Sequence, residues 1–361
     1  MLHSFTGGPD GGTPFGGLVR DPAGNLYGTT QVGGAGAGVV FKLSRTGKLT
    51  ALHRFTGPDG AFPEAGLVND SAGNLYGTTT AGGADKAGAV FKVDPAAMET
   101  VLYSFTGGAD GAAPDAALIR DSAGNLYGTT SGGGGGFYSP GVAFELDTAG
   151  AETVLCGFGG AGGKNPAAPL LRDASGNLYG TAVYGGTNNG GCAYGGCGVV
   201  FKLDAAGQET VLYTFTCGAD GAFPAAGLIR DPAGNLYGTA QGGGNLDIPY
   251  GDGVVFTLET NGAFSVLYSF AGGTDGAAPA ASLLRDPVGN LYGTTVNGGA
   301  ANGGIVFKLD RNGTETVLHT FTGPDGMYPY AGLIGDPAGD LYGTTTGGGA
   351  SNNGVVFEIS P

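Results

Sequence analysis

Aromatic and polar residues gather in three glycine-rich segments, SGGGGGFYSPG (131–141), YGGTNNGGCAYGGCG (184–198) and QGGGNLDIPYGDG (241–253). Aromatic side chains give a large contact area at low entropic cost, and amides or carboxylates beside them can hydrogen-bond to hydroxyl groups. This mixture is typical of sugar or peptide binding; the alternative is that the aromatic residues only pin long loops. The candidate ligand-binding residues are Phe137, Tyr138, Lys164, Tyr184, Asn188, Asn189, Tyr194, Asn245, Asp247, Tyr250 and Asp252.

Carboxylates and histidines also recur at regular positions. Six aspartates each precede a glycine: Asp10, Asp59, Asp110, Asp220, Asp275 and Asp325. They could attract cations, but Asp-Gly is also ordinary turn chemistry, which we favour. His3, His53 and His319 stand where other repeats carry tyrosine, in outer strands that diverge from one another, so they cannot meet at one ion. We therefore expect neither a metal nor a cofactor.

Catalytic motifs with a fixed spacing are missing. The chain has no G-x-S-x-G, no Walker loop, no H-E-x-x-H and no pair of C-x-x-C motifs, and only 3 histidines. Nucleophilic hydrolysis is therefore disfavoured. Paired carboxylates for cleaving a glycoside remain open, because they can come from segments far apart in the sequence.

Two of the four cysteines, Cys192 and Cys197, lie five residues apart in CAYGGC, where we expect a small disulfide-closed loop. Cys156 and Cys217 occupy corresponding places in adjacent repeats and could form a second bridge or remain two thiols. A disulfide together with only 12% charged residues favours a secreted or cell-surface protein. Neither a secretion signal nor an anchor is recognisable, so any export signal would have been removed.

The net charge of −15 excludes most nucleic-acid binding, because phosphate backbones would be repelled. No apolar run approaches the roughly 18 to 20 residues that a membrane-spanning helix needs. We expect a monomer that has neither a nucleic-acid partner nor a membrane span.

The tripeptide Leu-Tyr-Gly occurs seven times, with its tyrosine spaced by 49 to 58 residues. Each repeat reads as four short strands A to D, in the first repeat 17–21, 25–30, 39–43 and 49–55. Repeats of this length with four strands are typical of propeller blades. The sequence therefore predicts an all-β fold, one seven-bladed propeller of four antiparallel strands per blade that spans residues 1–361.

The ends of the chain predict how the ring closes. Repeat seven stops after strand C, whereas Leu2-His3-Ser4-Phe5 matches the strand D pattern of Leu52-His53-Arg54-Phe55. Strand 2–5 should therefore complete blade seven. One C–D turn departs from the others because Ala97 replaces the usual glycine, so that turn should be strained or of another type.

The motif D-x-x-G-N-L-Y-G-T-T, followed by a Gly-Gly loop and G-V-V-F-K-L, is nearly intact in all seven copies. In this motif the whole chain resembles the tandem-repeat GloVer family, secreted bacterial proteins whose full-length forms carry differing surface anchors. The resemblance implies location and repeat identity, and it assigns no activity. Its hairpin also looks like that of NHL-type propellers and streptogramin lyases, which supports the fold alone.

The leading hypothesis is a secreted or surface recognition module or scaffold that binds a carbohydrate or another surface ligand on the loop face of blades three to five. One alternative is a polysaccharide lyase or glycosidase that acts at the mouth of the central channel. Another is a purely structural surface repeat. Perturbed carboxylates at one site would favour the enzyme.

Overall fold

The computed structural model describes residues 1–134, 140–186, 195–245 and 251–360. Several residues of the expected binding site lie outside the described residues, and so does Cys192. They are Phe137, Tyr138, Asn188, Asn189, Tyr194, Asp247 and Tyr250.

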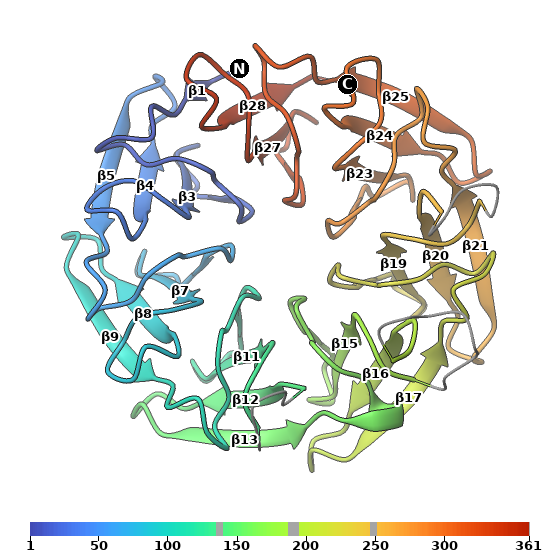
Figure 1. Ribbon diagram of the computed structural model, residues 1–361, viewed down its shortest axis with the longest axis horizontal. Helices are drawn as coiled ribbons and strands as arrows, with labels where there is room; N and C mark the ends of the chain where they lie inside the picture. The colour runs from blue at the N-terminus through green and yellow to red at the C-terminus, as the bar shows by residue number, and fades with distance from the viewer. Residues whose placement is uncertain (135–139, 187–194, 246–250, 361) are drawn as a thin grey trace.

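Seven four-stranded antiparallel sheets stand around a central channel as the blades of a propeller (Figure 1), which confirms the predicted fold. Blades 1 to 3 contain β2 (Val19–Arg20), β3 (Leu26–Thr30), β4 (Val39–Leu43), β5 (Leu49–Arg54); β6 (Val68–Asn69), β7 (Leu75–Thr79), β8 (Ala89–Val93), β9 (Glu99–Ser104); and β10 (Ile119–Arg120), β11 (Leu126–Thr130), β12 (Val142–Leu146), β13 (Glu152–Gly157). Blades 4 and 5 contain β14 (Leu171–Arg172), β15 (Leu178–Ala182), β16 (Val199–Leu203), β17 (Glu209–Thr214); and β18 (Ile229–Arg230), β19 (Leu236–Ala240), β20 (Val254–Leu258), β21 (Phe264–Ser269). Blades 6 and 7 contain β22 (Leu284–Arg285), β23 (Leu291–Thr295), β24 (Ile305–Leu309), β25 (Glu315–Thr320); and β26 (Ile334–Gly335), β27 (Leu341–Thr345), β28 (Val355–Ile359), β1 (His3–Ser4). A single 3₁₀ turn, η1 (Gly160–Gly162), is the only helix in these ranges, and no helix among them could cross a membrane.

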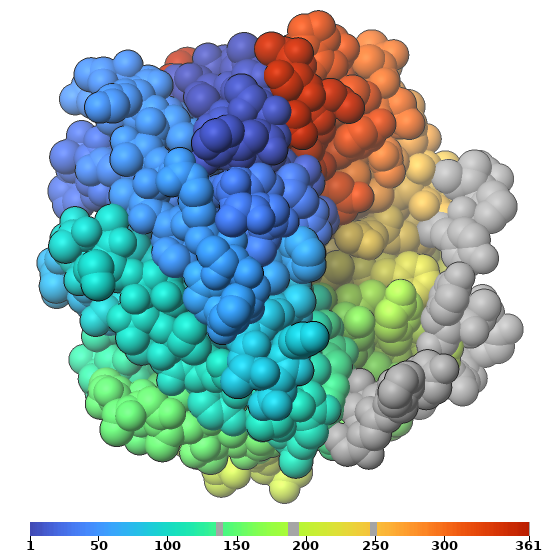
Figure 2. Space-filling view, turned by 60° about the vertical axis from the view of Figure 1, so that its left-hand side comes forward, coloured from blue at the N-terminus to red at the C-terminus, as the bar shows by residue number. Residues whose placement is uncertain are grey.

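The first strand closes the ring within blade 7, as the sequence predicts. β1 pairs antiparallel with β28, with His3 opposite Val356. The backbone N–H groups of Leu2 and Phe5 extend the pairing by donating to Val356 and Gly354 at 2.8 and 3.0 Å. The start and the end of the chain therefore lie side by side on the surface, deep blue beside red in Figure 2.

Phenylalanines hold neighbouring blades together. A strand D phenylalanine of one blade meets the strand C phenylalanine of the next, as Phe55 meets Phe91 with ring centroids 5.0 Å apart at 67°. Corresponding pairs join all seven blades, including Phe5 with Phe41 across the ring closure. Edge-to-face contacts of this kind add to the gain from burying the rings.

A threonine of strand B links each blade to the next. The hydroxyl of Thr29 donates to the carbonyl of Ala65 at 2.9 Å, and the last blade donates from Thr344 to Gly16 at 3.2 Å. The same bond occurs between the other blades. The recurring threonines thus have the inter-blade role expected of a residue that every repeat needs.

The tight turns follow the predicted chemistry. In the A–B turn of blade 1, Asp21 accepts hydrogen bonds from the Asn25 backbone at 2.8 Å and the Tyr27 hydroxyl at 3.0 Å. In the C–D turn of blade 2, Ala97 adopts φ of 63° and donates to Asp94 at 2.9 Å, as Gly47 does to Ser44 in blade 1. The turn type is therefore retained, and alanine is strained in it.

Candidate functional site at the channel mouth

The D–A segments and the B–C loops lie on one face of the ring, which we call the loop face. In every blade a bridge joins the two, for example Lys164 with Tyr184 and Ala112 with Gly132. The two sets of loops therefore share one face. The A–B turns lie at the other end of strands A and B, on the opposite face, which we call the turn face.

A proline near the start of each strand A fixes the chain at the channel mouth. Pro63 packs on Gly38 of the preceding blade, so closely that a Cβ added to this glycine would lie 2.4 Å from the proline Cδ. The residue before the proline is left-handed in all seven blades, with φ between 52° and 59°. Phe62, at this position, donates to the carbonyl of Ala37 at 2.8 Å and accepts from Thr80 at 3.1 Å. These bonds hold the strained backbone, so the residue after the proline is placed rigidly.

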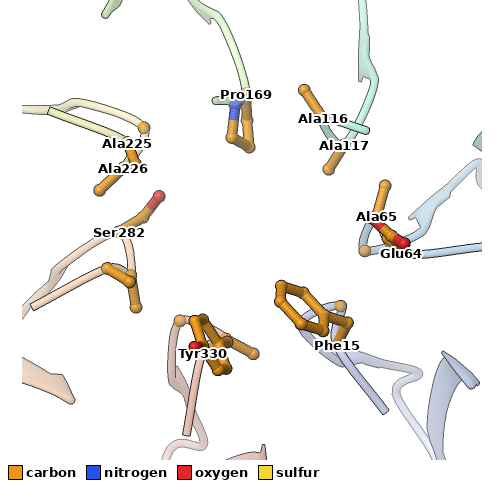
Figure 3. Close-up of a pocket in the computed structure, with 18 of the residues that line it drawn as sticks. Phe15, Glu64, Ala65, Ala116, Ala117, Pro169, Ala225, Ala226, Ser282 and Tyr330 are labelled. Atoms are coloured by element: carbon orange, nitrogen blue, oxygen red, sulfur yellow. The ribbon is translucent and has the colours of Figure 1, made fainter. Parts of the chain in front are cut away.

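The residues that follow the seven prolines form what we call the mouth ring: Phe15, Glu64, Asp115, Ala167, Ala225, Ala280 and Tyr330. All of them line a cavity of about 480 Å³ on the channel axis (Figure 3). This volume lies within the range of about 300–1,000 Å³ found for small-molecule sites. The backbone of the propeller has approximate sevenfold symmetry, but the side chains of the mouth ring do not. The mouth ring has two adjacent aromatic residues, two adjacent acids and three adjacent alanines.

The two acids of the mouth ring have different surroundings. Glu64 accepts a hydrogen bond of 2.6 Å from Nε2 of Gln31. Burial raises the pKa of Asp115 to about 6, hydrogen bonds from Ser131 and its own backbone oppose this shift, and the charge of Glu64 adds to it. Oδ1 of Asp115 is buried and has no hydrogen-bond partner among the described residues. A carboxyl group of this kind can take up or release a proton near neutral pH.

The aromatic side of the mouth ring joins blades 1 and 7. The rings of Phe15 and Tyr330 stack with centroids 4.5 Å apart and planes 22° apart, side by side in Figure 3. Two more aromatic residues, Phe62 and Tyr328, are 40% and 37% exposed and occupy the position before the proline. Of these aromatic residues, Phe15 and Tyr330 line the cavity beside the acids.

The six Asp-Gly aspartates serve their own loops at the outer rim. Asp59 accepts from the backbone and hydroxyl of Thr56, and also contacts Nε2 of His53 at 2.8 Å. Where other blades carry tyrosine, the tyrosine donates instead, as Tyr103 does to Asp110. Turn chemistry therefore explains the aspartates, and histidine replaces tyrosine as their partner.

Glutamates from the next blade approach these rim aspartates. His53, Asp59 and Glu99 bring one potential ligand atom each within 4.8 Å of one another. Burial raises the pKa of Glu99 to about 7, and the charge of Asp59 adds to this shift. Glu152 and Glu315 repeat the arrangement with Asp110 and Asp275, and burial raises the pKa of each to about 7.

The described residues of the expected binding surface on blades 3 to 5 do not all converge. Lys164 and Tyr184 lie together through backbone bonds of 2.9 and 3.1 Å, and the Tyr184 ring meets Phe223 at 5.8 Å. Asn245 lies at the start of the blade 5 loop. Asp252 is only 8% exposed, because its carboxylate lies against Gly272, where an added Cβ would be 2.5 Å from Oδ2.

The disulfide corrects the expected pairing of Cys192 with Cys197. Cys197 is bonded to Cys217, with Cα atoms 5.4 Å apart, while Cys192 lies outside the described residues. The reason is the strand register: Val199 of β16 lies opposite Thr214 of β17, so the residues just beyond this pair meet. Cys156 is a free thiol, and burial raises its pKa to about 11.

The mouth ring was missed at the sequence level although its signal is present. Loop length singles out blades 3 to 5, whereas the D–A segments that carry the mouth ring have nearly constant length. Aligning the seven prolines, from Pro14 to Pro329, and comparing the residue that follows each would have found the ring. A variable residue on an invariant scaffold is the pattern to look for.

Comparison with protein families agrees with the sequence motif. The Gloeobacter/Verrucomicrobia repeat matches residues 1–194, 100–248 and 192–361, so the chain belongs to this family of repeat proteins. A search of curated proteins gives no match.

Solved structures share the fold at low sequence identity. The extracellular domain assigned to a hybrid two-component system of B. thetaiotaomicron is 12% identical, with a TM-score of 0.61 over 98% of this chain. One assigned to a one-component system of the same organism is 14% identical, with a TM-score of 0.59 over 99%. The chain spans 40% of the length of each. A protein from Bacteroides uniformis described as a 6-phosphogluconolactonase is 16% identical, with a TM-score of 0.53 and 95% and 94% of the two chains covered. At these identities the likeness shows the fold alone.

Proposed function

We propose that this protein is a recognition propeller of the cell exterior that binds a carbohydrate on its loop face, with the mouth ring as the main contact. The observation that carries the proposal is the asymmetry of the ring. The stacked rings of Phe15 and Tyr330 offer an apolar wall, Glu64 and Asp115 offer acceptors, and three alanines leave room opposite. Aromatic platforms beside fixed polar groups suit the mixed apolar and hydroxyl faces of a sugar.

The proposed surface also includes the residues expected from the sequence on the longer loops of blades 3 to 5. Lys164, Tyr184 and Asn245 belong to the described part of the chain, whereas Phe137, Tyr138, Asn188, Asn189, Tyr194, Asp247 and Tyr250 lie outside it and stay a prediction from the sequence. Asp252 has a different role in the proposal, since its buried carboxylate supports the loop.

A location outside the cell is also part of the proposal. A disulfide such as Cys197–Cys217 persists in oxidising surroundings. The two sensor-type structures that share the fold are extracellular domains. Both observations agree with a protein exposed at the surface.

A glycan-cleaving enzyme is the second candidate, and Asp115 favours it. A carboxyl group whose pKa is raised to about 6 beside a second carboxylate is suited to proton transfer. Such an enzyme would release new reducing or unsaturated ends, whereas a binding module would not.

The test is affinity electrophoresis against a panel of plant and microbial polysaccharides, with the same mixtures assayed for new ends. We expect retardation without products, lost in Phe15→Ala and Tyr330→Ala. Tyr194→Ala and Tyr250→Ala should weaken it less, since the mouth ring is proposed as the main contact. Retardation that survives both mouth-ring substitutions would contradict the proposed site, and products would favour the enzyme. No retardation on any polysaccharide would reject both glycan functions.

A further inference from the structure

We propose that the mouth ring selects a cationic amino sugar, whose ammonium group lies between the carboxylates of Glu64 and Asp115. This inference rests on the proposed function and names the class of its ligand. Four observations support it: the charge of the cavity lining, the hydrogen bonding of its two acids, the position of its aromatic rings and the arginines on the opposite face of the propeller.

The charge of the lining is wholly negative. Among the described residues that line the cavity, Glu64 and Asp115 are acidic, and none is lysine, arginine or histidine. Both acids lie on neighbouring blades, close enough for the charge of Glu64 to act on Asp115. Removing water from the cavity strengthens such a field, so a cation is attracted and an anion is repelled.

One oxygen of Asp115 is short of a donor. Gln31 donates to Oε1 of Glu64, while Oδ1 of Asp115 is buried and has no partner among the described residues. A buried acceptor without a donor is costly, and a ligand that supplies the donor removes the cost. An ammonium group carries three donors and a positive charge, whereas a hydroxyl group carries one donor and no charge.

The aromatic rings lie where the sugar ring would stack. Phe15 precedes Glu64 by one blade, and Tyr330 precedes Phe15, so the aromatic and acidic parts of the mouth ring are contiguous. A sugar can therefore lie on the rings with an amino substituent directed to the acids. Ala225 and Ala280, with Ala167, leave the opposite part of the cavity open for the rest of the glycan.

Four arginines lie on the turn face, away from the mouth ring. Arg20, Arg120, Arg172 and Arg230 end strand A in their blades, and each lies over a tyrosine of the preceding blade at 5.4–6.0 Å. A uronate or sulfated glycan would be repelled from the mouth ring by the carboxylates of Glu64 and Asp115. This disfavours a polysaccharide lyase among the enzyme alternatives, since its uronate substrate would face two carboxylates.

The test compares oligosaccharides of one length by isothermal titration calorimetry at pH 7, above the pKa of about 6 of Asp115, with EDTA present to exclude metal bridges. The probes are β-1,4-linked glucosamine, N-acetylglucosamine, glucose and an oligogalacturonate. We expect the glucosamine oligomer to bind about tenfold more tightly than the glucose oligomer, as a charge-assisted hydrogen bond implies. The oligogalacturonate should bind most weakly.

Substitutions separate the two proposals. Glu64→Gln and Asp115→Asn should remove the preference for glucosamine, because they weaken its binding about tenfold more than that of the glucose oligomer, while Phe15→Ala weakens both alike. The fold should tolerate these changes, because three blades carry alanine at the same position. Glu259→Gln, in an exposed turn away from the channel, is the matched control. Binding that depends on Phe15 but shows no preference for the amine rejects this inference alone. Binding of none of the oligomers rejects the proposed function with it.

Discussion

Phe15, Glu64 and Ala225 occupy the same place in three blades, after the same proline and the same left-handed residue. The scaffold therefore accepts an aromatic ring, an acid or a methyl group there. Tyr27 and Thr29, in contrast, have counterparts with the same hydrogen bonds in every blade. Within a repeat protein, residues that vary on a constant backbone are thus the better candidates for a function.

Replacing Ala97 by glycine should stabilise the protein. Ala97→Gly removes the cost of a left-handed alanine at φ of 63°, so we expect the free energy of unfolding to rise by about 0.5–1 kcal/mol. Gly47→Ala, in the equivalent turn at φ of 80°, is the matched control and should lower it by a similar amount. Denaturant titration measures both. A loss of stability in Ala97→Gly would show that the alanine is not strained.

Residue-level prediction from the sequence was uneven for physical reasons. The turn role of the rim aspartates and the strain at Ala97 follow from local turn chemistry, which can be recognised in the sequence. The bond between Cys197 and Cys217 depends on the register of β16 and β17, which short spacing does not reveal. The raised pKa of Asp115 depends on burial in the closed ring.

The bounds of strands B and C in the first repeat were predicted to within one residue, because their apolar and β-branched residues repeat seven times along the chain. Strand A was expected over 17–21, whereas β2 covers Val19–Arg20. The difference arises because the chain before it packs backbone to backbone with the next blade: a Cβ added to Gly16 would lie 2.4 Å from the carbonyl oxygen of Ala65. No local sequence pattern encodes this close approach.

β1 is the element on which closure depends, and Phe5 is its anchor. Phe5 is fully buried and packs edge to face on Phe41. We expect Phe5→Ala to lower the free energy of unfolding by about 3–5 kcal/mol, and to promote association through the released edge of β28. Denaturant titration and size-exclusion chromatography would measure the two effects.

The control for Phe5→Ala is His3→Tyr in the same strand. Blades 2, 4 and 5 carry tyrosine at this position, where it donates to the rim aspartate. Little change in stability is expected in this variant. Equal losses from both substitutions would indicate general sensitivity of the chain terminus and contradict the anchoring role.

For the whole molecule, the buried glutamates of the rim predict a stability optimum in mild acid. The pKa of Glu99, Glu152 and Glu315 is about 7 in the folded protein against 4.5 as the ordinary value. The folded state therefore holds protons that the unfolded chain releases, and the free energy of unfolding falls as the pH rises from about 4.5 to 7. Below that range the turn aspartates, such as Asp21 with its lowered pKa, lose their hydrogen-bonded charge.

Thermal unfolding between pH 3 and 9 should thus show a maximum near pH 4.5, the ordinary pKa of these glutamates. The triple substitution Glu99→Gln, Glu152→Gln and Glu315→Gln should flatten the limb above pH 5 and leave the acid limb unchanged. Glu259→Gln, in an exposed turn, is the control. An unchanged slope above pH 5 in the triple variant would contradict the role of these glutamates.

The stacked pair of Phe15 and Tyr330 spans the place where the ring can open. Phe15 follows β1 along the chain and Tyr330 precedes β28, so separating these strands frees the two rings from each other. A ligand that contacts both rings would therefore link blades 1 and 7 and stabilise the closed ring. Ligand binding in the channel and closure of the ring are then thermodynamically coupled. The bound ligand slows the separation of β1 from β28, and a change that weakens this strand pairing lowers the affinity for the ligand.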